Sequence, residues 1–163
     1  MEVFYEDFEV GKIYQSPGRT ISEADLVNFA AFSGDWFPLH TDEEFSKSGP
    51  FKGRIAHGLL GLAITEGLKF RIHHFLGATY IASLYWNYKF TSPIHIGDTV
   101  TLKVLIQSKR ETKHPERGMV VEYVSMFNQK GEVVGEGEHG LLIKRRSFAP
   151  NPSNAADVQQ LSY

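Results

Sequence analysis

The amino-acid sequence predicts an α+β fold in which a curved antiparallel sheet packs around one buried helix. Helical patterns fill the first half of the chain and four strand-like stretches fill the second, an order typical of α+β proteins. The segment 57–72 is apolar around most of its circumference, as expected for a helix enclosed by other structure. The links between the strand-like stretches are too short for a parallel crossover, so the sheet is expected to be antiparallel.

The length and composition fit one domain. The chain has 163 residues, of which 42% are hydrophobic, which is enough for a single self-supporting core. The apolar periodicity ends near residue 147, where Pro, Asn and Ser accumulate. We therefore expect one domain at 1–146 and a polar, poorly ordered tail at 147–163.

The first helix has signals at both ends. An extended piece is expected at 12–20, before Ser22, which can cap a helix with Asp25 three residues on. Gly34 ends this helix. Pro38 cannot donate to a helix ladder and favours extended geometry before it, which predicts a tight non-helical turn at 35–39.

Two more helices and four strands complete the expected order. Thr41 and Glu44 have the spacing of a capping box that opens a short helix, and Gly49 ends it. The buried helix follows at 57–72. Strands are expected at 79–90, 98–110, 118–129 and 132–145, and the second alternates most clearly between apolar and polar residues.

Charge and residue usage exclude several classes of function. Seventeen Lys and Arg against nineteen Asp and Glu give a formal net charge of −2, which supplies no basic field for nucleic acid. The absence of cysteine excludes disulfides, Cys-ligated metal centres and thiol nucleophiles, and it fits a reducing compartment, so a cytoplasmic location is expected. No apolar run is long enough for a membrane span, and the first residues lack the basic and apolar regions of a signal peptide.

A carboxylate and an imidazole flank the proline turn. Asp35 and His40 are five residues apart, so both side chains can reach one point. Such a pair can hold a water molecule, take a proton from it and return one, as addition of water to an activated double bond requires. The structural alternative is that Asp35 is a turn residue and that His40 makes a local hydrogen bond.

A second motif, G-R-I-A-H-G at 53–58, leads directly into the buried helix. Free N–H groups at a helix start can stabilise an oxyanion such as a thioester enolate, and Gly58 would let a substrate approach the backbone. The alternative is that Gly58 only allows the helix and the sheet to pack closely. His57 is expected to support this loop through a backbone hydrogen bond.

Together these segments resemble the MaoC-like, (R)-specific 2-enoyl-CoA hydratase family of hotdog-fold proteins. The resemblance covers most of residues 10–145. It is carried by the runs S-G-D-x-x-P-L-H at 33–40, H-G at 57–58 and F-x-x-P-x-x-x-G-D at 90–98. It implies a curved antiparallel sheet wrapped around one long central helix. It also implies a homodimer or higher homo-oligomer whose sheets join side by side, with each active site near the subunit interface.

The resemblance implies an activity as well. Asp35 and His40 would bind the catalytic water, and the Gly58 amide would donate to the thioester oxygen. Syn addition to a trans-2-enoyl-CoA would give the (R)-3-hydroxyacyl-CoA, and the same site would dehydrate in reverse. The substrate would be an acyl-CoA, with no metal and no redox cofactor, since coenzyme A is part of the substrate.

One position departs from the family pattern. These enzymes commonly carry Asn immediately before the proline, where this chain has Phe37. Phe cannot form the hydrogen bond that an amide side chain would provide. Either a backbone or neighbouring group takes that role, or the substrate differs, or the site has lost activity.

Other polar residues have weaker signals. Glu66, eight residues after Gly58, could act as an auxiliary acid if it is desolvated, or could lie at an exposed or dimer-facing edge. Adjacent histidines at 73–74 lack the spacing that aims two imidazoles at one ion, so no metal site is predicted. Four cations of a charged hairpin tip are candidate contacts for the phosphates of coenzyme A, or simply part of a solvated loop; they are Lys109, Arg110, Lys113 and Arg117.

Two further functions stay open. A hotdog module could bind an acyl thioester or a partner chain without turning it over, and Phe37 is the feature that favours this reading. A thioesterase is the third candidate, because a fold does not determine a function.

Overall fold

The computed structural model describes residues 2–146, and the tail expected at 147–163 lies outside the described residues. The described part has a six-stranded antiparallel sheet with strand order β1-β4-β5-β6-β3, and β2 pairs with β4 beside β1. The strands are β1 (Ile13–Gln15), β2 (Arg19–Thr20), β3 (Tyr80–Phe90), β4 (Thr99–Glu111), β5 (Arg117–Phe127) and β6 (Val133–Lys144). The predicted strand boundaries are therefore confirmed to within two residues, and the predicted α+β class is confirmed.

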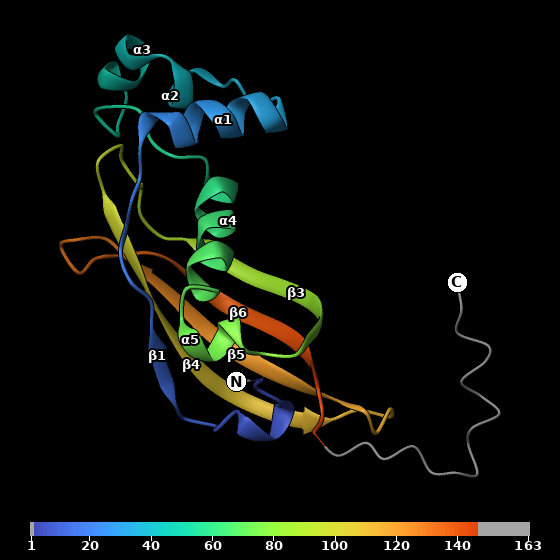
Figure 1. Ribbon diagram of the computed structural model, residues 1–163. Helices are drawn as coiled ribbons and strands as arrows, with labels where there is room; N and C mark the ends of the chain where they lie inside the picture. Colours follow the sequence, from blue (N-terminus) through green and yellow to red (C-terminus); the bar gives the residue numbers. More distant parts are fainter. Residues whose placement is uncertain (1, 147–163) are drawn as a thin grey trace.

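One helix lies against the inner face of the curved sheet, as predicted (Figure 1). The helices are η1 (Tyr5–Asp7), α1 (Glu23–Ser33), α2 (Pro38–Thr41), α3 (Glu43–Ser48), α4 (Gly58–Lys69) and α5 (His73–Leu76). Helix α4 is the central helix, and α1, α2 and α3 gather beyond its first turn. We call these three helices the helical cap.

The core forms where α4 meets the sheet. The apolar side chains predicted to face inward from β4 are all fully buried: Val100, Leu102, Val104 and Ile106. Helix α4 contributes Leu60, Ile64 and Leu68, which recur at four-residue spacing and are at most 7% exposed. This packing fixes how α4 lies against the sheet.

Three local expectations were wrong. Pro38 begins a helical turn, α2, instead of belonging to a non-helical turn, because proline is well suited to the first position of a helix. The carboxylate of Asp42, not Thr41, caps α3 by accepting from the Phe45 N–H at 2.9 Å. The central helix ends at Lys69 instead of 72, and a separate turn, α5, follows.

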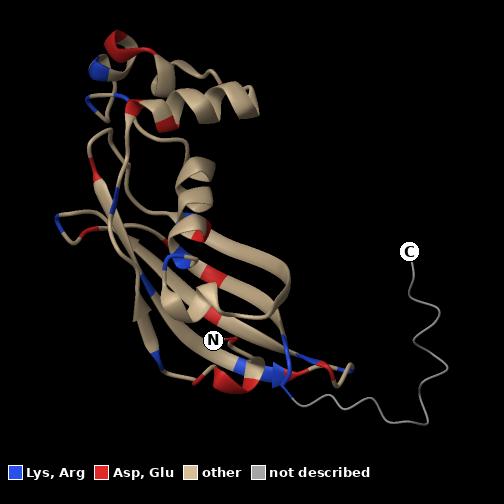
Figure 2. Ribbon diagram, viewed as in Figure 1, with Lys and Arg blue, Asp and Glu red and all other residues tan. Residues whose placement is uncertain are grey.

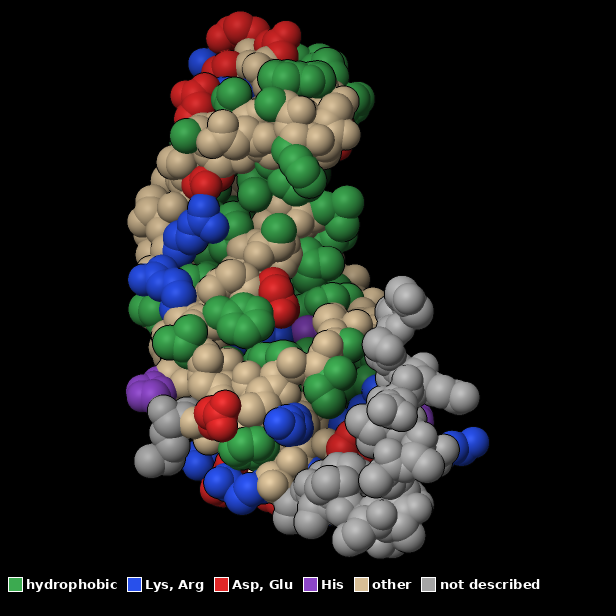
Figure 3. Space-filling view, turned by 45° about the vertical axis from the view of Figure 1, so that its right-hand side comes forward, with side chains coloured by type: hydrophobic (Ala, Val, Ile, Leu, Met, Phe, Trp, Pro, Cys, Tyr) green, Lys and Arg blue, Asp and Glu red, His purple; other side chains and the backbone are tan. Residues whose placement is uncertain are grey.

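Helix α4 is also less enclosed than its composition suggests. Leu59, Ala63 and Gly67 lie one turn apart and are exposed, with Leu59 at 63%. Strand β3 lies at the edge of the sheet, and within the described residues it pairs only with β6. Figure 3 shows apolar side chains gathered on this face of the molecule. No helix of residues 2–146 is long and apolar enough to cross a membrane.

Candidate active site

Helix α1 delivers Asp35 to the site. Ser22 caps α1 by accepting from the Asp25 N–H, and the Asp25 carboxylate accepts from the Ser22 N–H at 2.8 Å, so the predicted capping box is confirmed. Gly34 ends the helix with a φ of +77°, a left-handed conformation that favours glycine. The chain therefore turns sharply just before Asp35.

His40 is held by the backbone in front of α4. Its Nδ1 lies 2.7 Å from the Ile55 carbonyl oxygen. A carbonyl can only accept, so Nδ1 carries the hydrogen and Nε2 keeps its lone pair in the neutral ring. This arrangement leaves Nε2 of His40 available as a base.

His57 connects the two motifs. The residue is 3% exposed and precedes α4, and its Nε2 donates to the backbone carbonyl of Asp35 at 3.0 Å. Its ring stacks on that of His40, with centroids 3.8 Å apart and planes at 28°. The predicted supporting role agrees with this geometry, because His57 joins the turn that carries Asp35 to the start of α4.

Asp35, His40 and His57 form a compact group of polar atoms. One side-chain donor or acceptor atom from each residue lies within 4.8 Å of the others. Each imidazole has one nitrogen bound to a backbone carbonyl. Such a group can hold a water molecule through hydrogen bonds or bind a metal ion, since a metal-bound histidine also donates its second nitrogen to a carbonyl or carboxylate.

Phe37 contributes a backbone group. Its N–H donates to Oδ1 of Asp35 at 3.2 Å, so a main-chain amide orients the carboxylate although the side chain has no donor. The Phe37 ring meets the His40 ring edge-on at 6.4 Å and is 55% exposed. This geometry favours the first explanation for the missing Asn, in which the backbone takes a positioning role.

Gly58 opens α4 and faces a cavity. Within the described residues no acceptor is bound to its N–H, and the helix dipole adds partial positive charge there. A Cβ on Gly58 would lie 2.9 Å from the Phe90 ring, so the glycine permits close packing, and its role as an oxyanion donor stays a prediction. The cavity has a volume of about 300 Å³, and the residues that line it include His40, His57, Gly58, Phe90, Ile94, Met126 and Val134.

Glu66 lies outside this cavity. Its carboxylate is 3.0 Å from the Lys69 ammonium at the end of α4, and its side chain is 34% exposed. The four candidate phosphate contacts also lie away from the cavity. Phe90 pairs with Gly135 at the cavity end of β6, whereas Arg117 pairs with Lys144 at the opposite end.

The hairpin cations differ from one another. Lys109 donates to the Phe8 carbonyl at 2.6 Å, and burial lowers the pKa of its ammonium group. Arg110, Lys113 and Arg117 instead border a shallow depression at the hairpin tip.

The sequence interpretation missed a buried polar cluster at the last turn of α4. Lys69, Glu122 and His139 are fully buried, with the ammonium 2.7 Å from Glu122 and 2.9 Å from Nδ1 of His139. Figure 2 shows charged positions where this end of α4 meets the sheet. Burial and the nearby carboxylates of Glu122 and Glu66 raise the pKa of Tyr80, which lies over the cluster.

Ser83 and His139 could be mistaken for a hydrolytic pair. The Ser83 hydroxyl lies 2.7 Å from Nε2 of His139, whose Nδ1 is 2.9 Å from Glu122. Nδ1 of His139 faces two opposing partners, the Lys69 ammonium, which can only donate, and the Glu122 carboxylate, which can only accept. Each neutral tautomer therefore satisfies one of these two partners. The cluster does not line the cavity beside His40 and Gly58, and we assign it no catalytic role.

Comparison with known proteins gives a consistent picture. The family model described as "MaoC like domain" matches residues 8–126. The chain is 33% identical over 143 residues to a protein of Rhodospirillum rubrum named (R)-specific enoyl-CoA hydratase, and the match covers 88% of this chain and 93% of that protein.

Solved structures agree with this match. The crystal structure of a MaoC-like dehydratase from Rhodospirillum rubrum aligns with a TM-score of 0.79 at 27% identity, over 90% of this chain and 99% of the other. A protein of Mycobacterium tuberculosis described as having a double hotdog fold aligns with a TM-score of 0.78 at 16% identity, over 92% of this chain and 47% of the other. The predicted hotdog fold is thus confirmed.

Proposed function

Because the chain belongs to the MaoC-like domain family, whose members include hydratases and dehydratases of acyl thioesters, we propose that it hydrates a trans-2-enoyl-CoA to the (R)-3-hydroxyacyl-CoA and catalyses the reverse dehydration. The observation that supports this proposal is that polar side-chain atoms of Asp35, His40 and His57 lie within 4.8 Å of one another, and that His40, His57 and Gly58 line an apolar cavity. The acyl part of the substrate would occupy this cavity, since most of the side chains that line it are apolar.

The proposed chemistry uses one water molecule between Asp35 and His40. Nε2 of His40 takes a proton as the water oxygen bonds to C3 of the substrate. The electron pair of the double bond moves toward the thioester, and the Gly58 N–H stabilises the negative charge on its oxygen. The Asp35 and His40 pair then returns a proton to C2 on the same face. No electrons leave the substrate, so the reaction requires no redox cofactor.

We further propose that two copies associate along β3. The outer edge of β3 has no partner strand within the described residues, and Ile81 and Leu84 on this strand are 46% and 45% exposed. Leu59, Ala63 and Gly67, one turn apart on α4, are exposed as well. A second copy would extend the sheet and cover these apolar residues. A sedimentation measurement that finds only monomers would contradict this.

The catalytic assignment is tested with Asp35→Asn and His40→Ala. Loss of a positioned acid or base lowers kcat by roughly a hundredfold or more, and loss of the enoyl-thioester absorbance with crotonyl-CoA and longer trans-2-enoyl-CoAs measures it. Glu44→Gln and His114→Ala are matched controls, because both residues are exposed and lie outside the cavity. Full turnover by either site variant with an intact fold would contradict the assignment.

The same experiment separates the alternatives. Saturable binding of the enoyl-CoA without an absorbance change would replace the proposal with a binding module. Release of free thiol would replace it with a thioesterase.

A further inference from the structure

We propose that Arg54 is a positioning residue, which locks the helical cap onto the loop in front of α4 and thereby sets the orientation of His40. This inference rests on the proposed function for its kinetic part, because it assumes that His40 is the base. Arg54 does not line the cavity, so we expect its effect on the reaction to pass through the backbone of the loop.

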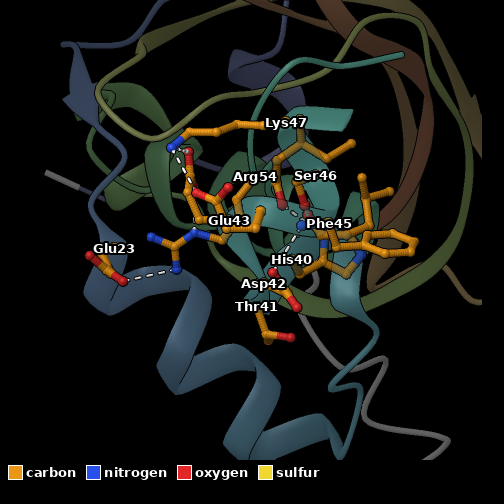
Figure 4. Close-up of polar contacts among 12 residues, drawn as sticks. Glu23, His40, Thr41, Asp42, Glu43, Phe45, Ser46, Lys47 and Arg54 are labelled. Carbon is orange, nitrogen blue, oxygen red and sulfur yellow. Dashed lines mark hydrogen bonds and ion pairs between the residues drawn. The ribbon is translucent and has the colours of Figure 1, made fainter. Parts of the chain in front are cut away.

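The guanidinium group of Arg54 joins two helices of the cap. Its Nη1 is 2.9 Å from Oε1 of Glu23, and its Nε donates to Oε2 of Glu43 at 3.0 Å. Glu23 is the first residue of α1 and Glu43 is the first residue of α3. Figure 4 shows Arg54 between these two carboxylates, on the loop that precedes α4. One cation therefore ties three segments together.

The residue next to Arg54 holds the proposed base. The Ile55 carbonyl accepts the His40 Nδ1–H at 2.7 Å, and the Ile55 N–H donates to the Leu39 carbonyl at 3.4 Å. The residue that forms the two ion pairs, Arg54, is therefore directly followed by the residue whose carbonyl accepts from His40, Ile55. If the loop moves relative to α1 and α3, the carbonyl that orients the imidazole moves with it.

An arginine is better suited than a lysine to contact both carboxylates at once. The guanidinium offers donors in a fixed planar fork that can reach two separate carboxylates, whereas a lysine ammonium is a point charge on a flexible stem. The hydrogen bonds that Arg54 donates to Glu23 and then to Glu43 raise the pKa of its guanidinium group.

Stability does not account well for this arrangement. The side chain of Arg54 is 15% exposed, but those of Glu23 and Glu43 are 60% and 45% exposed, and ion pairs with exposed partners stabilise proteins little. The geometry of the cap is therefore the property that Arg54 is placed to control.

The test compares Arg54→Gln, Arg54→Lys and the double variant Glu23→Gln/Glu43→Gln, with kcat and KM measured on an enoyl-CoA that the native protein hydrates. Displacing a catalytic group slightly can lower a rate by up to about a hundredfold, so we expect R54Q to lower kcat by at least roughly tenfold while KM changes less than about threefold. The double variant should have the same kcat as R54Q. Adding R54Q to the double variant should lower kcat no further, because all three substitutions remove the same pair of ionic contacts. R54K should recover only part of the rate.

A second measurement does not depend on activity. The proton on Nδ1 of His40 can be followed by NMR in protein labelled with ¹⁵N at histidine, because its hydrogen bond to the Ile55 carbonyl shields it from exchange. This resonance should broaden or shift in R54Q and in E23Q/E43Q. The control is Lys47→Gln, since Lys47 also contacts Glu43, at 3.7 Å, but does not bridge to α1.

The outcomes separate the two proposals. A wild-type protein that hydrates no enoyl thioester removes the proposed function, and the His40 resonance still decides the role of Arg54. An R54Q variant with native kcat and an unchanged His40 resonance overturns the positioning role. So does an R54Q variant whose melting temperature falls while both of those readouts stay native, because Arg54 is then only structural.

Discussion

Lys69→Met should destabilise the protein far more than removal of any exposed lysine. Lys69 is fully buried and supplies the cation for Glu122, which is also fully buried. In the variant, Glu122 keeps only the His139 ring beside one oxygen, and its other oxygen already has no hydrogen-bond partner among the described residues. Breaking a buried ion pair by removing one partner costs about 3–5 kcal/mol, a large part of the roughly 5–15 kcal/mol that stabilises a typical domain.

The magnitude can be checked by urea unfolding at pH 7 and fixed protein concentration. At about 2–4 °C per kcal/mol for a chain of this size, the melting temperature should also fall by roughly 10 °C. The double variant Lys69→Met/Glu122→Leu should recover most of the loss, because an apolar pair of similar volume avoids the unpaired charge. Lys47→Met, which breaks only exposed pairs, should change the free energy of unfolding by less than about 0.5 kcal/mol. A loss below about 1 kcal/mol in K69M would refute the reasoning.

Two other perturbations test the site and the core. Gly58→Ala should lower kcat about tenfold or more, because its Cβ would lie 2.9 Å from the Phe90 ring and displace either that ring or the amide. Native turnover in this variant would contradict the displacement but not the oxyanion role, because alanine keeps the backbone N–H. His74→Phe tests how the stability of the protein depends on pH. The pKa of His74 lies below its ordinary 6.5, because burial and, to a smaller extent, the charge of Lys12 disfavour the protonated ring. The unfolded chain therefore binds this proton more readily, so wild-type stability is full above about pH 6.5 and decreases as the pH falls through the lowered folded value. The wild type should consequently lose more stability than H74F between pH 7 and pH 5 in parallel melts, and equal losses would exclude His74 as the source.

The sequence predicted those parts of the fold and site that depend on neighbours along the chain. The Ser22 cap, the Gly34 helix end and the alternation along β4 are local patterns, and the structure has all three. Asp35 and His40 are also close in sequence, so a turn was sufficient to bring them together. The motif at 33–40 could therefore be interpreted without coordinates.

Contacts between distant residues could not be predicted in this way. Lys69 and His139 are 70 residues apart, and each has a common alternative as an exposed side chain. Arg54 and Glu23 meet only because α1 folds back over the loop in front of α4. Such pairs depend on the register between elements, which a single sequence does not specify.

The two ends of α4 are linked mechanically. Helix α4 has twelve residues, so at 1.5 Å per residue it is about 18 Å long, and a helix of this length moves largely as a rigid body. Its last turn is anchored through Lys69 to β5 and β6, while its first turn presents the free Gly58 amide to the cavity. We therefore predict that the buried ion pair contributes to the position of the proposed oxyanion donor, although the two lie at opposite ends of the helix. K69M/E122L, with stability recovered but without this polar anchor, should for that reason show a lower kcat than the wild type even well below its melting temperature, and a native kcat would show that apolar packing alone positions the amide.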